Sequence, residues 1–332
     1  MSERNRLIEG FLIHHGWGEA ERVPLAADAS FRTYDRLTDG DSRAVLMDAP
    51  PPKEDVRPFA RIADHLHALG FSVPVVRARD VEAGLLLLDD LGDATYTRLL
   101  RAGEDEEDLY RLAVDVLIAL HRRPVAEAVP DGTPLYDQDK FLAEAALLPD
   151  WFLPACPGYR LSAQARAEYD ALWAALHSQA CDVPPTLVLR DFHVDNLMRL
   201  DRPGVRACGL LDFQDALRGP VTYDLMSLLE DARRDIAPAL VARLSERYLE
   251  AFPDLDREAF AASWAIWAAQ RHAKVIGIFT RLCVRDGKPV YLDHIPRVWR
   301  LLQNALCHPA LAGLRDWFDR HVPMELRRRP PL

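Results

Sequence analysis

Three polar residues in the second half of the chain combine a possible proton acceptor with possible metal ligands. Asp191 and Asn196 stand five residues apart in the segment RDFHVDN, and Asp212 follows the short apolar run GLL. A positioned carboxylate can accept a proton from a hydroxyl group, whereas carboxylate and amide oxygens are hard ligands of the kind that Mg²⁺ prefers. We therefore predict that Asp191 is a catalytic base and that Asn196 and Asp212 bind Mg²⁺.

This combination matches the needs of phosphoryl transfer. Catalysis of that reaction consists mostly of positioning and of neutralising the charge that develops, so it requires a base for the acceptor hydroxyl and ligands for a metal. The order and spacing of the three residues also reproduce the catalytic loop of kinases and its metal-binding aspartate. Each feature alone has a structural alternative, because a lone D-x-x-x-x-N is common and Asp212 could cap a turn. Their order between two short strands favours a kinase.

The elements that must position these residues change character along the chain. The first 91 residues predict a helix over 3–15, then strand, strand, strand, helix, strand, strand, with turn residues at Asp-Ala-Ser and Thr-Asp-Gly-Asp. The predicted strands cover 22–26, 31–38, 43–48, 73–77 and 85–88, and the helix covers about 54–70. Beyond residue 91 the periodicity is helical, except where 186–189 and 209–211 bracket the segment with Asp191. We place a domain boundary near residue 91.

Composition limits the class of protein. At 332 residues, with 49% hydrophobic and 28% charged residues, the chain is long enough for two lobes of an ordinary globular protein. A formal charge of −10 argues against a nucleic-acid partner, because binding to a phosphate backbone usually requires a basic surface. Five widely spaced cysteines suit a reducing cytoplasm, and neither a signal peptide nor a long apolar run is present. We expect a cytoplasmic monomer without a membrane anchor.

Several motifs resemble the aminoglycoside phosphotransferase and choline kinase superfamily, and most closely its N-acetylmuramate/N-acetylglucosamine anomeric kinases. The similar segments span nearly the whole chain: ADASFRTYDRL, VLMDAPP, LLLLDDLGD, LVLRDFHVDNLM, GLLDFQDALRGP, YDLMSLLEDARRD and RLCVRDGKP. The resemblance implies an α+β, protein-kinase-like bilobal fold. Its small five-stranded antiparallel N-lobe with one main helix, residues 1–91, would cover the nucleotide. Its large helical C-lobe, residues 92–332, would hold the catalytic loop and the substrate site.

The same resemblance implies where ATP binds. The hinge would fall at Asp89, Asp90 and Leu91, whose backbone would bind adenine. The turn that contains Ser30, Phe31 and Arg32 would lie over the phosphates, although the chain has no G-x-G-x-x-G pattern there. Backbone N–H groups of a tight turn can still hold phosphate oxygens. The choice between ATP and GTP stays open.

Two positions depart from the kinase pattern. Leu189 stands where these kinases usually have a supporting histidine, two residues before the base. Met47 stands near the position of the lysine that contacts the nucleotide phosphates. We expect another cation to replace that lysine and prefer Arg32 to Lys53, because the guanidinium fork matches phosphate geometry.

The substrate side must supply convergent donors and acceptors near Asp191. His193 and Asp195 share the catalytic loop, and Gln214 and Asp215 follow the metal ligand, so we predict that all four contact the substrate.

Further on, the segment YDLMSLLEDARRD reads as a helix. Arg233 in it could pair with Glu230 or bind the carboxylate of an acidic sugar. We expect Asp224 to support the catalytic loop and Trp264 and Trp267 to lie in the core, and we interpret RLCVRDGKP as a loop.

The resemblance implies a small-molecule kinase that transfers the ATP γ-phosphoryl group to the anomeric hydroxyl of N-acetylmuramate and N-acetylglucosamine. The product would be a sugar α-1-phosphate for cell-wall recycling. Two alternatives remain: a kinase for another small hydroxyl compound, of the aminoglycoside or choline type, and an inert nucleotide-binding pseudokinase. Retention of Asp191, Asn196 and Asp212 argues against the inert protein.

Overall fold

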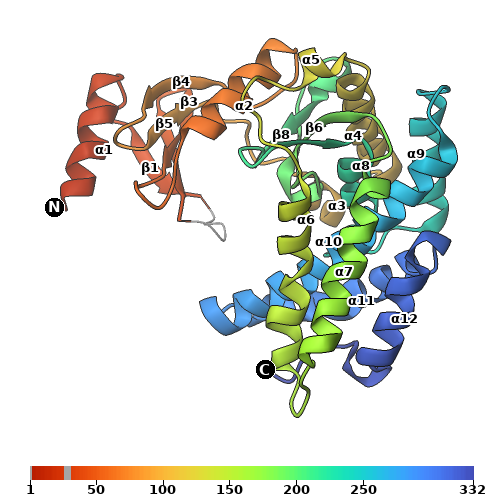
Figure 1. Cartoon of the computed structure of the whole chain (residues 1–332). Helices are drawn as coiled ribbons and strands as arrows, with labels where there is room; N and C mark the ends of the chain where they lie inside the picture. The colour runs from red at the N-terminus through yellow and green to blue at the C-terminus, as the bar shows by residue number, and fades with distance from the viewer. Residues whose placement is uncertain (1, 26–30) are drawn as a thin grey trace. The chain divides into compact units, whose positions relative to one another are not determined.

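The computed structural model describes residues 2–25 and 31–332, and its contacts divide the chain into two compact units (Figure 1). The first unit runs to residue 116 and includes residues 194–216, and the second comprises residues 117–193 and 217–332. The predicted boundary near residue 91 concerns the nucleotide-covering lobe and stays a prediction. Across the described residues, none of the helices has the length and apolar character that crossing a membrane requires.

The first unit is built on a five-stranded antiparallel sheet, which confirms the predicted N-terminal architecture. Its strands lie in the spatial order β1-β2-β3-β5-β4. They are β1 (Glu21–Pro24), β2 (Thr33–Asp39), β3 (Ser42–Asp48), β4 (Val76–Asp80) and β5 (Leu85–Leu88). A two-residue turn at Gly40 and Asp41 joins β2 to β3, and Gly40 has the positive φ of 56° that such hairpins favour.

The first two helices of this unit are α1 (Glu3–His14) and α2 (Arg57–Ala68). Figure 1 shows α1 beside the sheet, where Ile8, Phe11 and Leu12 share a buried cluster with leucines of β2, β3 and β5. The main helix, α2, buries one amphipathic face. Its Phe59 ring stacks on Phe213 with 5.0 Å between ring centroids. This contact connects α2 to the segment that carries Asp212.

A second, two-stranded sheet in the first unit consists of β7 (Leu197–Arg199) and β8 (Cys208–Leu210). Isolated bridges join this hairpin to Ser72, which precedes β4 in the chain, and to Thr95, which follows β5. Thr95 also caps α3 (Tyr96–Ala102), which lies in the region beyond residue 91 that the sequence predicts to be helical. The next helix, α4 (Glu106–His121), continues into the second unit.

The second unit is mostly helical and is organised around the long helix α10. Its helices are α5 (Val125–Ala128), α6 (Gln138–Ala145), α7 (Ala163–Ala180), α8 (Thr222–Leu229), α9 (Pro238–Glu250), α10 (Arg257–Asp286), α11 (Ile295–Ala305) and α12 (Ala312–His321). α10 contacts α6, α7, α8 and α11. One short antiparallel ladder, β6 (Pro185–Val188) with β9 (Leu217–Pro220), completes the unit.

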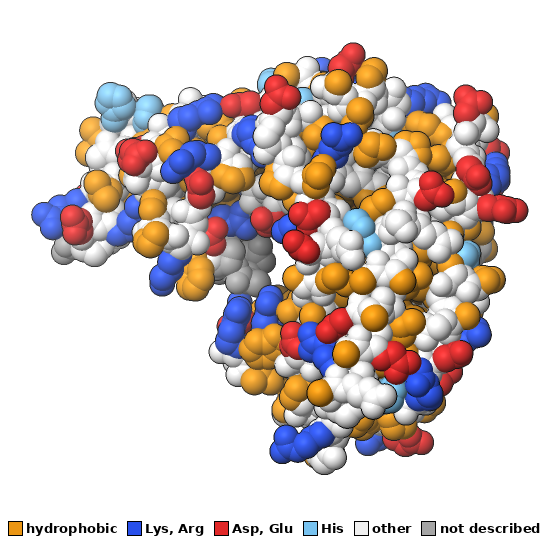
Figure 2. All heavy atoms as spheres, in the orientation of Figure 1, with side chains coloured by type: hydrophobic (Ala, Val, Ile, Leu, Met, Phe, Trp, Pro, Cys, Tyr) orange, Lys and Arg blue, Asp and Glu red, His pale blue; other side chains and the backbone are white. Residues whose placement is uncertain are grey.

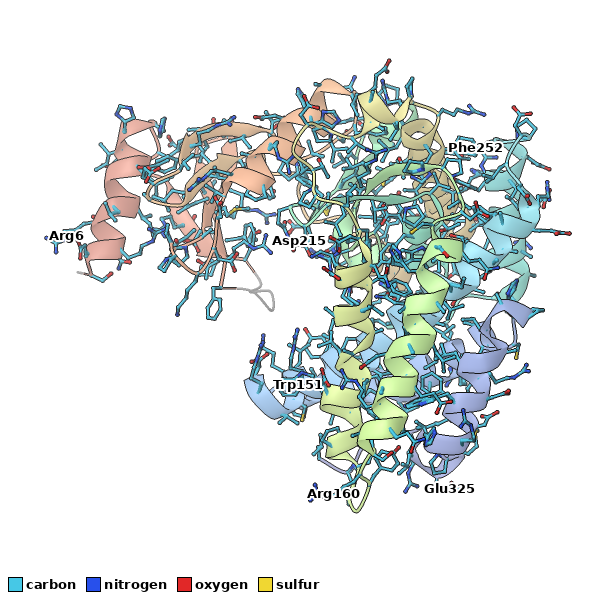
Figure 3. All side chains as sticks on the ribbon, in the orientation of Figure 1. Arg6, Trp151, Arg160, Asp215, Phe252 and Glu325 are labelled. Carbon is cyan, nitrogen blue, oxygen red and sulfur yellow. The ribbon has the colours of Figure 1, made fainter. Side chains whose placement is uncertain are left out.

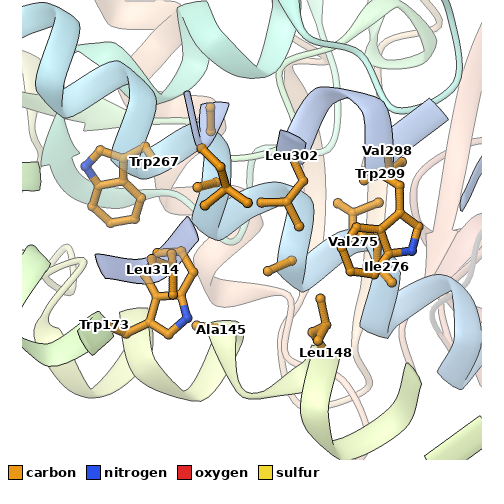
Figure 4. Close-up of a cluster of buried hydrophobic side chains, with 14 of the residues drawn as sticks. Ala145, Leu148, Trp173, Trp267, Val275, Ile276, Val298, Trp299, Leu302 and Leu314 are labelled. Atoms are coloured by element: carbon orange, nitrogen blue, oxygen red, sulfur yellow. The ribbon is translucent and has the colours of Figure 1, made fainter. Parts of the chain in front are cut away.

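The core of this unit is rich in tryptophan. Figure 4 shows Trp173, Trp267 and Trp299 among leucine and valine side chains, and all three are fully buried. Trp267 donates its indole N–H to the Ala180 carbonyl at 2.9 Å, which satisfies the buried donor. The prediction of a core role for Trp267 is confirmed, whereas Trp264 is only half-buried and donates to Glu230 at 2.6 Å.

Two predicted elements were wrong. The segment with Glu230 and Arg233 is not helical, because α8 ends at Leu229. Asp231 accepts the backbone N–H of Arg233 at 2.7 Å, a local bond that competes with helix continuation. RLCVRDGKP is not a loop over its first six residues, because α10 continues to Asp286 and ends at Gly287 with a φ of 66°.

The surface carries both signs of charge. On the face shown in Figure 2, acidic and basic side chains are interspersed. Several form exposed ion pairs, such as Arg257 with Glu246 at 2.7 Å. Exposed pairs of this kind contribute about 0–1 kcal/mol each, so the apolar cores of the two units account for more of the stability.

Candidate active site

Asp191 follows β6 through a turn with unusual backbone geometry. Arg190 has a positive φ of 71°, and the Asp191 N–H donates to the Leu189 carbonyl at 2.9 Å. Such a conformation costs of order 1 kcal/mol or more in a residue other than glycine, so surrounding contacts must hold it. Asp224 in α8 provides them: its Oδ2 and Oδ1 accept the N–H groups of Leu189 and Arg190 at 2.6 and 2.9 Å. Asp224 therefore fixes the backbone next to the predicted base.

The environment of Asp224 is unusual for a carboxylate. Burial raises the pKa of Asp224 to about 7, although the two backbone N–H groups act in the opposite direction. The negative charge of Asp191 adds to the increase, and Arg271 opposes it. The contacts confirm the supporting role that the sequence predicts for Asp224, and they place a titrating group directly behind the loop.

The side chain of Arg190 enters a polar cluster inside the second unit. Arg190 Nη2 and Lys274 Nζ contact the same oxygen, Oε1 of Glu144, at 2.6 and 3.0 Å. Gln270 donates to Oε2 at 3.2 Å, and the Tyr136 hydroxyl donates to the same oxygen. Burial would raise the pKa of Glu144, but Lys274 and Arg190 lower it to about 2. Glu144 is therefore ionised and anchors the side chain beside Asp191.

Two predicted substrate residues lie in the second unit. The first is His193, which is 6% exposed, whereas the neighbouring predicted base Asp191 is half-buried. Arg233 lies in the segment after α8, with its guanidinium 5.8 Å from the centroid of the Phe279 ring. Contact of His193 and Arg233 with a substrate stays a prediction.

The predicted metal ligands are brought together in the first unit. Asn196 precedes β7 and Asp212 follows β8, and the register pairs Leu197 with Leu210. The Leu211 N–H donates to the Asn196 carbonyl at 2.9 Å, which extends the ladder to the two ligands. Asn196 Nδ2 and Asp212 Oδ2 lie 3.4 Å apart, and Asp212 has a positive φ of 58°. Strained backbone of this kind is frequent at functional sites.

The surroundings of Asp212 fit a cation. Its carboxylate contacts Gln214 Nε2 at 2.9 Å and Arg32 Nη2 at 3.6 Å, in addition to Asn196. Donors therefore converge on one half-buried carboxylate next to an amide. A carboxylate and an amide oxygen, completed by water and phosphate oxygens, form a typical Mg²⁺ site.

The guanidinium of Arg32, the predicted substitute for the missing lysine, lies near two carboxylates. Its guanidinium lies 3.6 Å from Asp212 and 3.8 Å from Glu54, and the side chain is 11% exposed. Burial alone would lower the pKa of Arg32, but Tyr34, Asp212 and Glu54 outweigh it and raise the pKa. Glu54 also accepts the backbone N–H of Phe31 at 3.1 Å, so it contacts both residues 31 and 32.

The remaining residues of this region have other surroundings. Met47 is fully buried in β3, opposite Tyr34 and Leu86, and belongs to the core. Lys53 lies 4.6 Å above the exposed Phe31 ring. Ser30, which was predicted to cover the phosphates, lies outside the described residues.

A pocket of about 330 Å³ lies within the first unit, between the predicted hinge and the predicted metal ligands. Val45, Leu88 and Met198 form part of its apolar wall. Asp89, Asp90, Leu91, Asn196 and Asp212 also line it. The volume and the combination of an apolar wall with a few polar groups are typical of small-molecule sites. The pocket therefore brings together two groups of residues that the sequence separates by about a hundred positions.

Arg36 is a pocket residue that the sequence patterns did not indicate. Its guanidinium contacts Asp90 Oδ2 at 2.8 Å, both Asp93 oxygens at 3.0 Å and the Gly92 carbonyl at 3.1 Å. The Gly92 N–H in turn donates to Asp90 at 2.8 Å. Arg36 thereby attaches the predicted hinge segment to β2. A single arginine in a strand is not part of any sequence motif, so its contact with Asp90 becomes apparent only from the structure.

The other predicted substrate residues of the first unit differ in exposure. The Thr97 hydroxyl of α3 donates to Asp195, which is half-buried. Gln214 contacts both Asp212 and Asp215, the latter at 3.3 Å, and Asp215 is exposed (labelled in Figure 3). Gln214 and Asp215 are thus next to the predicted metal ligand Asp212, whereas Asp195 contacts Thr97 near the start of α3.

The fold is that of kinases and phosphotransferases acting on small molecules. A solved ternary complex of the phosphotransferase APH(2″)-IIa with streptomycin and ATP is similar to 93% of this chain and 98% of its own. The TM-score is 0.57 and the sequence identity is 16%, a likeness that concerns the fold. The protein-kinase-like architecture is therefore confirmed.

The sequence comparisons define the family. The model of the phosphotransferase enzyme family matches residues 21–261, so the chain belongs to that family. An N-acetylmuramate/N-acetylglucosamine kinase of Caulobacter vibrioides is 39% identical over 98% of this chain and 99% of its own length. A kinase of the same name from Pseudomonas aeruginosa is 42% identical, covering 92% of this chain and 90% of that protein.

Proposed function

We propose that the chain transfers the γ-phosphoryl group of ATP to the anomeric hydroxyl of N-acetylmuramate and N-acetylglucosamine. One observation supports the choice of sugar most: two relatives that carry this kinase name are similar to the chain over at least nine-tenths of its length. The pocket between the hinge and the two metal ligands supports the use of a nucleotide.

The proposed mechanism assigns one task to each group of residues. Asp191 accepts the proton of the anomeric hydroxyl as its oxygen attacks the γ-phosphorus, and the bond to the bridging oxygen breaks to release ADP. Asn196 and Asp212 would hold Mg²⁺, which when bound neutralises phosphate charge. Arg32 would contact the phosphates in place of the lysine absent at Met47.

The hinge and the sugar site complete the assignment. The backbone of Asp89, Asp90 and Leu91 would bind adenine, and Ser30 and Phe31 would cover the phosphates. The sugar would contact residues around the base and behind the metal: His193, Asp195, Gln214, Asp215 and Arg233. We further propose that the protein is a cytoplasmic monomer whose sugar α-1-phosphate product enters cell-wall recycling.

The test is incubation of the purified protein with ATP·Mg²⁺ and a panel of sugars, aminocyclitols and choline. Phosphorus NMR distinguishes a phosphate on the anomeric carbon from one at another hydroxyl. We expect a 1-phosphate from both N-acetylated sugars. Phosphorylation of an aminoglycoside or of choline instead would support the first alternative, and ATP binding without any product would support the inert protein.

A further inference from the structure

The side chains around Glu144 fill its acceptor positions. Four side chains, those of Arg190, Lys274, Gln270 and Tyr136, donate to the two oxygens of Glu144. A carboxylate offers about four acceptor positions, so Glu144 is saturated. The Lys274 ammonium has three donors, and Glu144 is its one acceptor among the described residues. The cluster can therefore accept a further anionic group.

The charges of the cluster lead to the same conclusion. Lys274 and Arg190 are two cations on one carboxylate, and Glu144 stays ionised because those cations lower its pKa. Among these three side chains, two cations face one carboxylate, and the Asp191 carboxylate acts on Arg190, so Lys274 is the cation with the smaller share of negative charge. Lys274 is close to the predicted base, because Arg190 directly precedes Asp191 and both cations contact the same Glu144 oxygen.

The cluster is shielded from water but not closed. The side chains of Lys274 and Arg190 are 12% and 16% exposed, and that of Glu144 is 12% exposed. Charges in such partly buried positions are screened less than surface charges, so an added ion pair is stronger there. A small anion that reaches the exposed part of Lys274 would meet an ammonium that Glu144 already holds in place.

We propose that Lys274, held by Glu144, binds the carboxylate of an acidic amino-sugar substrate and favours it over the neutral sugar. The inference rests on the proposed function, because N-acetylmuramate carries a lactyl carboxylate that N-acetylglucosamine lacks. Lys274 is preferred to Arg233, the residue suggested by sequence, for a structural reason. Arg233 lies over the Phe279 ring in the segment after α8, whereas Lys274 shares its acceptor with the residue next to the base.

The test compares both sugars in the same variant. In Lys274→Gln, kcat/KM for N-acetylmuramate should fall about ten- to a hundredfold relative to kcat/KM for N-acetylglucosamine, the range expected for one hydrogen bond to a charged group. A smaller fraction of folded protein lowers kcat/KM for both sugars equally, so the ratio of the two values is unaffected by it. Lys288→Gln, which removes a lysine outside the cluster, should leave the ratio unchanged. Lys274→Arg, which keeps the charge, should restore part of the preference.

Each other outcome overturns the inference or its basis. An equal loss for both sugars in Lys274→Gln makes Lys274 structural, and a selective loss in Arg233→Gln alone assigns the carboxylate to Arg233. If Lys274→Gln does not fold, ionic strength decides with the unmodified protein. Salt should raise KM for N-acetylmuramate but not for N-acetylglucosamine, and identical salt dependence refutes the ion pair. Absence of product from both sugars with the unmodified protein rejects the proposed function itself.

Discussion

Replacing Arg32 by alanine tests how the protein manages without a lysine in β3. Arg32 is 11% exposed and contacts Asp212 and Glu54 at 3.6 and 3.8 Å, within reach of the pocket that Asp212 lines. We expect ATP to replace part of these contacts with phosphate oxygens. Arg32→Ala should then weaken ATP binding more than adenosine binding, and it should reduce the rate.

The expected magnitude follows from the contacts that Arg32 already makes. A hydrogen bond to a charged group contributes about 1.5–3 kcal/mol, which corresponds to roughly a ten- to hundredfold change in affinity. Because the guanidinium leaves two carboxylates to reach the nucleotide, part of this gain is offset. We therefore expect the lower end of the range, about tenfold for ATP, and less than about threefold for adenosine.

Calorimetry with ATP and adenosine on the same protein sample separates this effect from a folding defect. Lys53→Ala is the matched control, because Lys53 lies over the Phe31 ring and not between the two carboxylates. The titration is then repeated without Mg²⁺. If Arg32 contacts the phosphates directly, Arg32→Ala weakens ATP binding under both conditions. If it acts through the metal site at Asp212, the loss of ATP affinity disappears without Mg²⁺. An equal loss of both ligands, or no loss of either, would refute the reasoning and make Lys53 the next candidate.

Three further variants test the metal site, the core and the support of the catalytic loop. Asp212→Ala should abolish the Mg²⁺ dependence of ATP binding in calorimetry, and unchanged dependence would place the metal elsewhere. Met47→Ala should cost about 2–5 kcal/mol of unfolding free energy in urea titrations with little change in phosphate affinity, since Met47 is fully buried. Because the pKa of Asp224 is raised to about 7, the folded protein holds a proton that the unfolded chain releases. The free energy of unfolding should therefore decrease as the pH rises from about 4 to about 7, by up to roughly 1.4 kcal/mol per pH unit. Asp224→Asn, which cannot titrate, should remove this slope.

Much of the fold follows from local patterns in the sequence. The number and order of the five strands and α2 were predictable because turn residues separate short apolar runs, and the α2 segment repeats its apolar residues at helical spacing. The bounds were less accurate, since the strand predicted at 73–77 is β4, Val76–Asp80. The spacing of Asp191, Asn196 and Asp212 also predicted the candidate active site. β7 and β8 then bring Asn196 and Asp212 together, and the first unit adds Arg32 to them.

Other features depend on contacts between distant segments. Leu217–Pro220 contains Gly219 and Pro220, poor strand residues, yet it forms β9 because it pairs with β6. The helix predicted through Arg233 ends early because Asp231 bonds to the local backbone. The roles of Arg36 and Glu144 depend on register and on packing between helices, and no short motif encodes either.

The turnover of Asp191→Asn is the measurement that tests the account most directly. The variant keeps the size of the side chain while removing the proton acceptor, so ATP affinity should stay within about threefold of the unmodified protein. Formation of N-acetylglucosamine 1-phosphate, followed by phosphorus NMR, should slow by at least about a hundredfold, the usual contribution of a positioned base. Near-normal turnover in a folded, ATP-binding Asp191→Asn protein would contradict the assignment of Asp191 as the base.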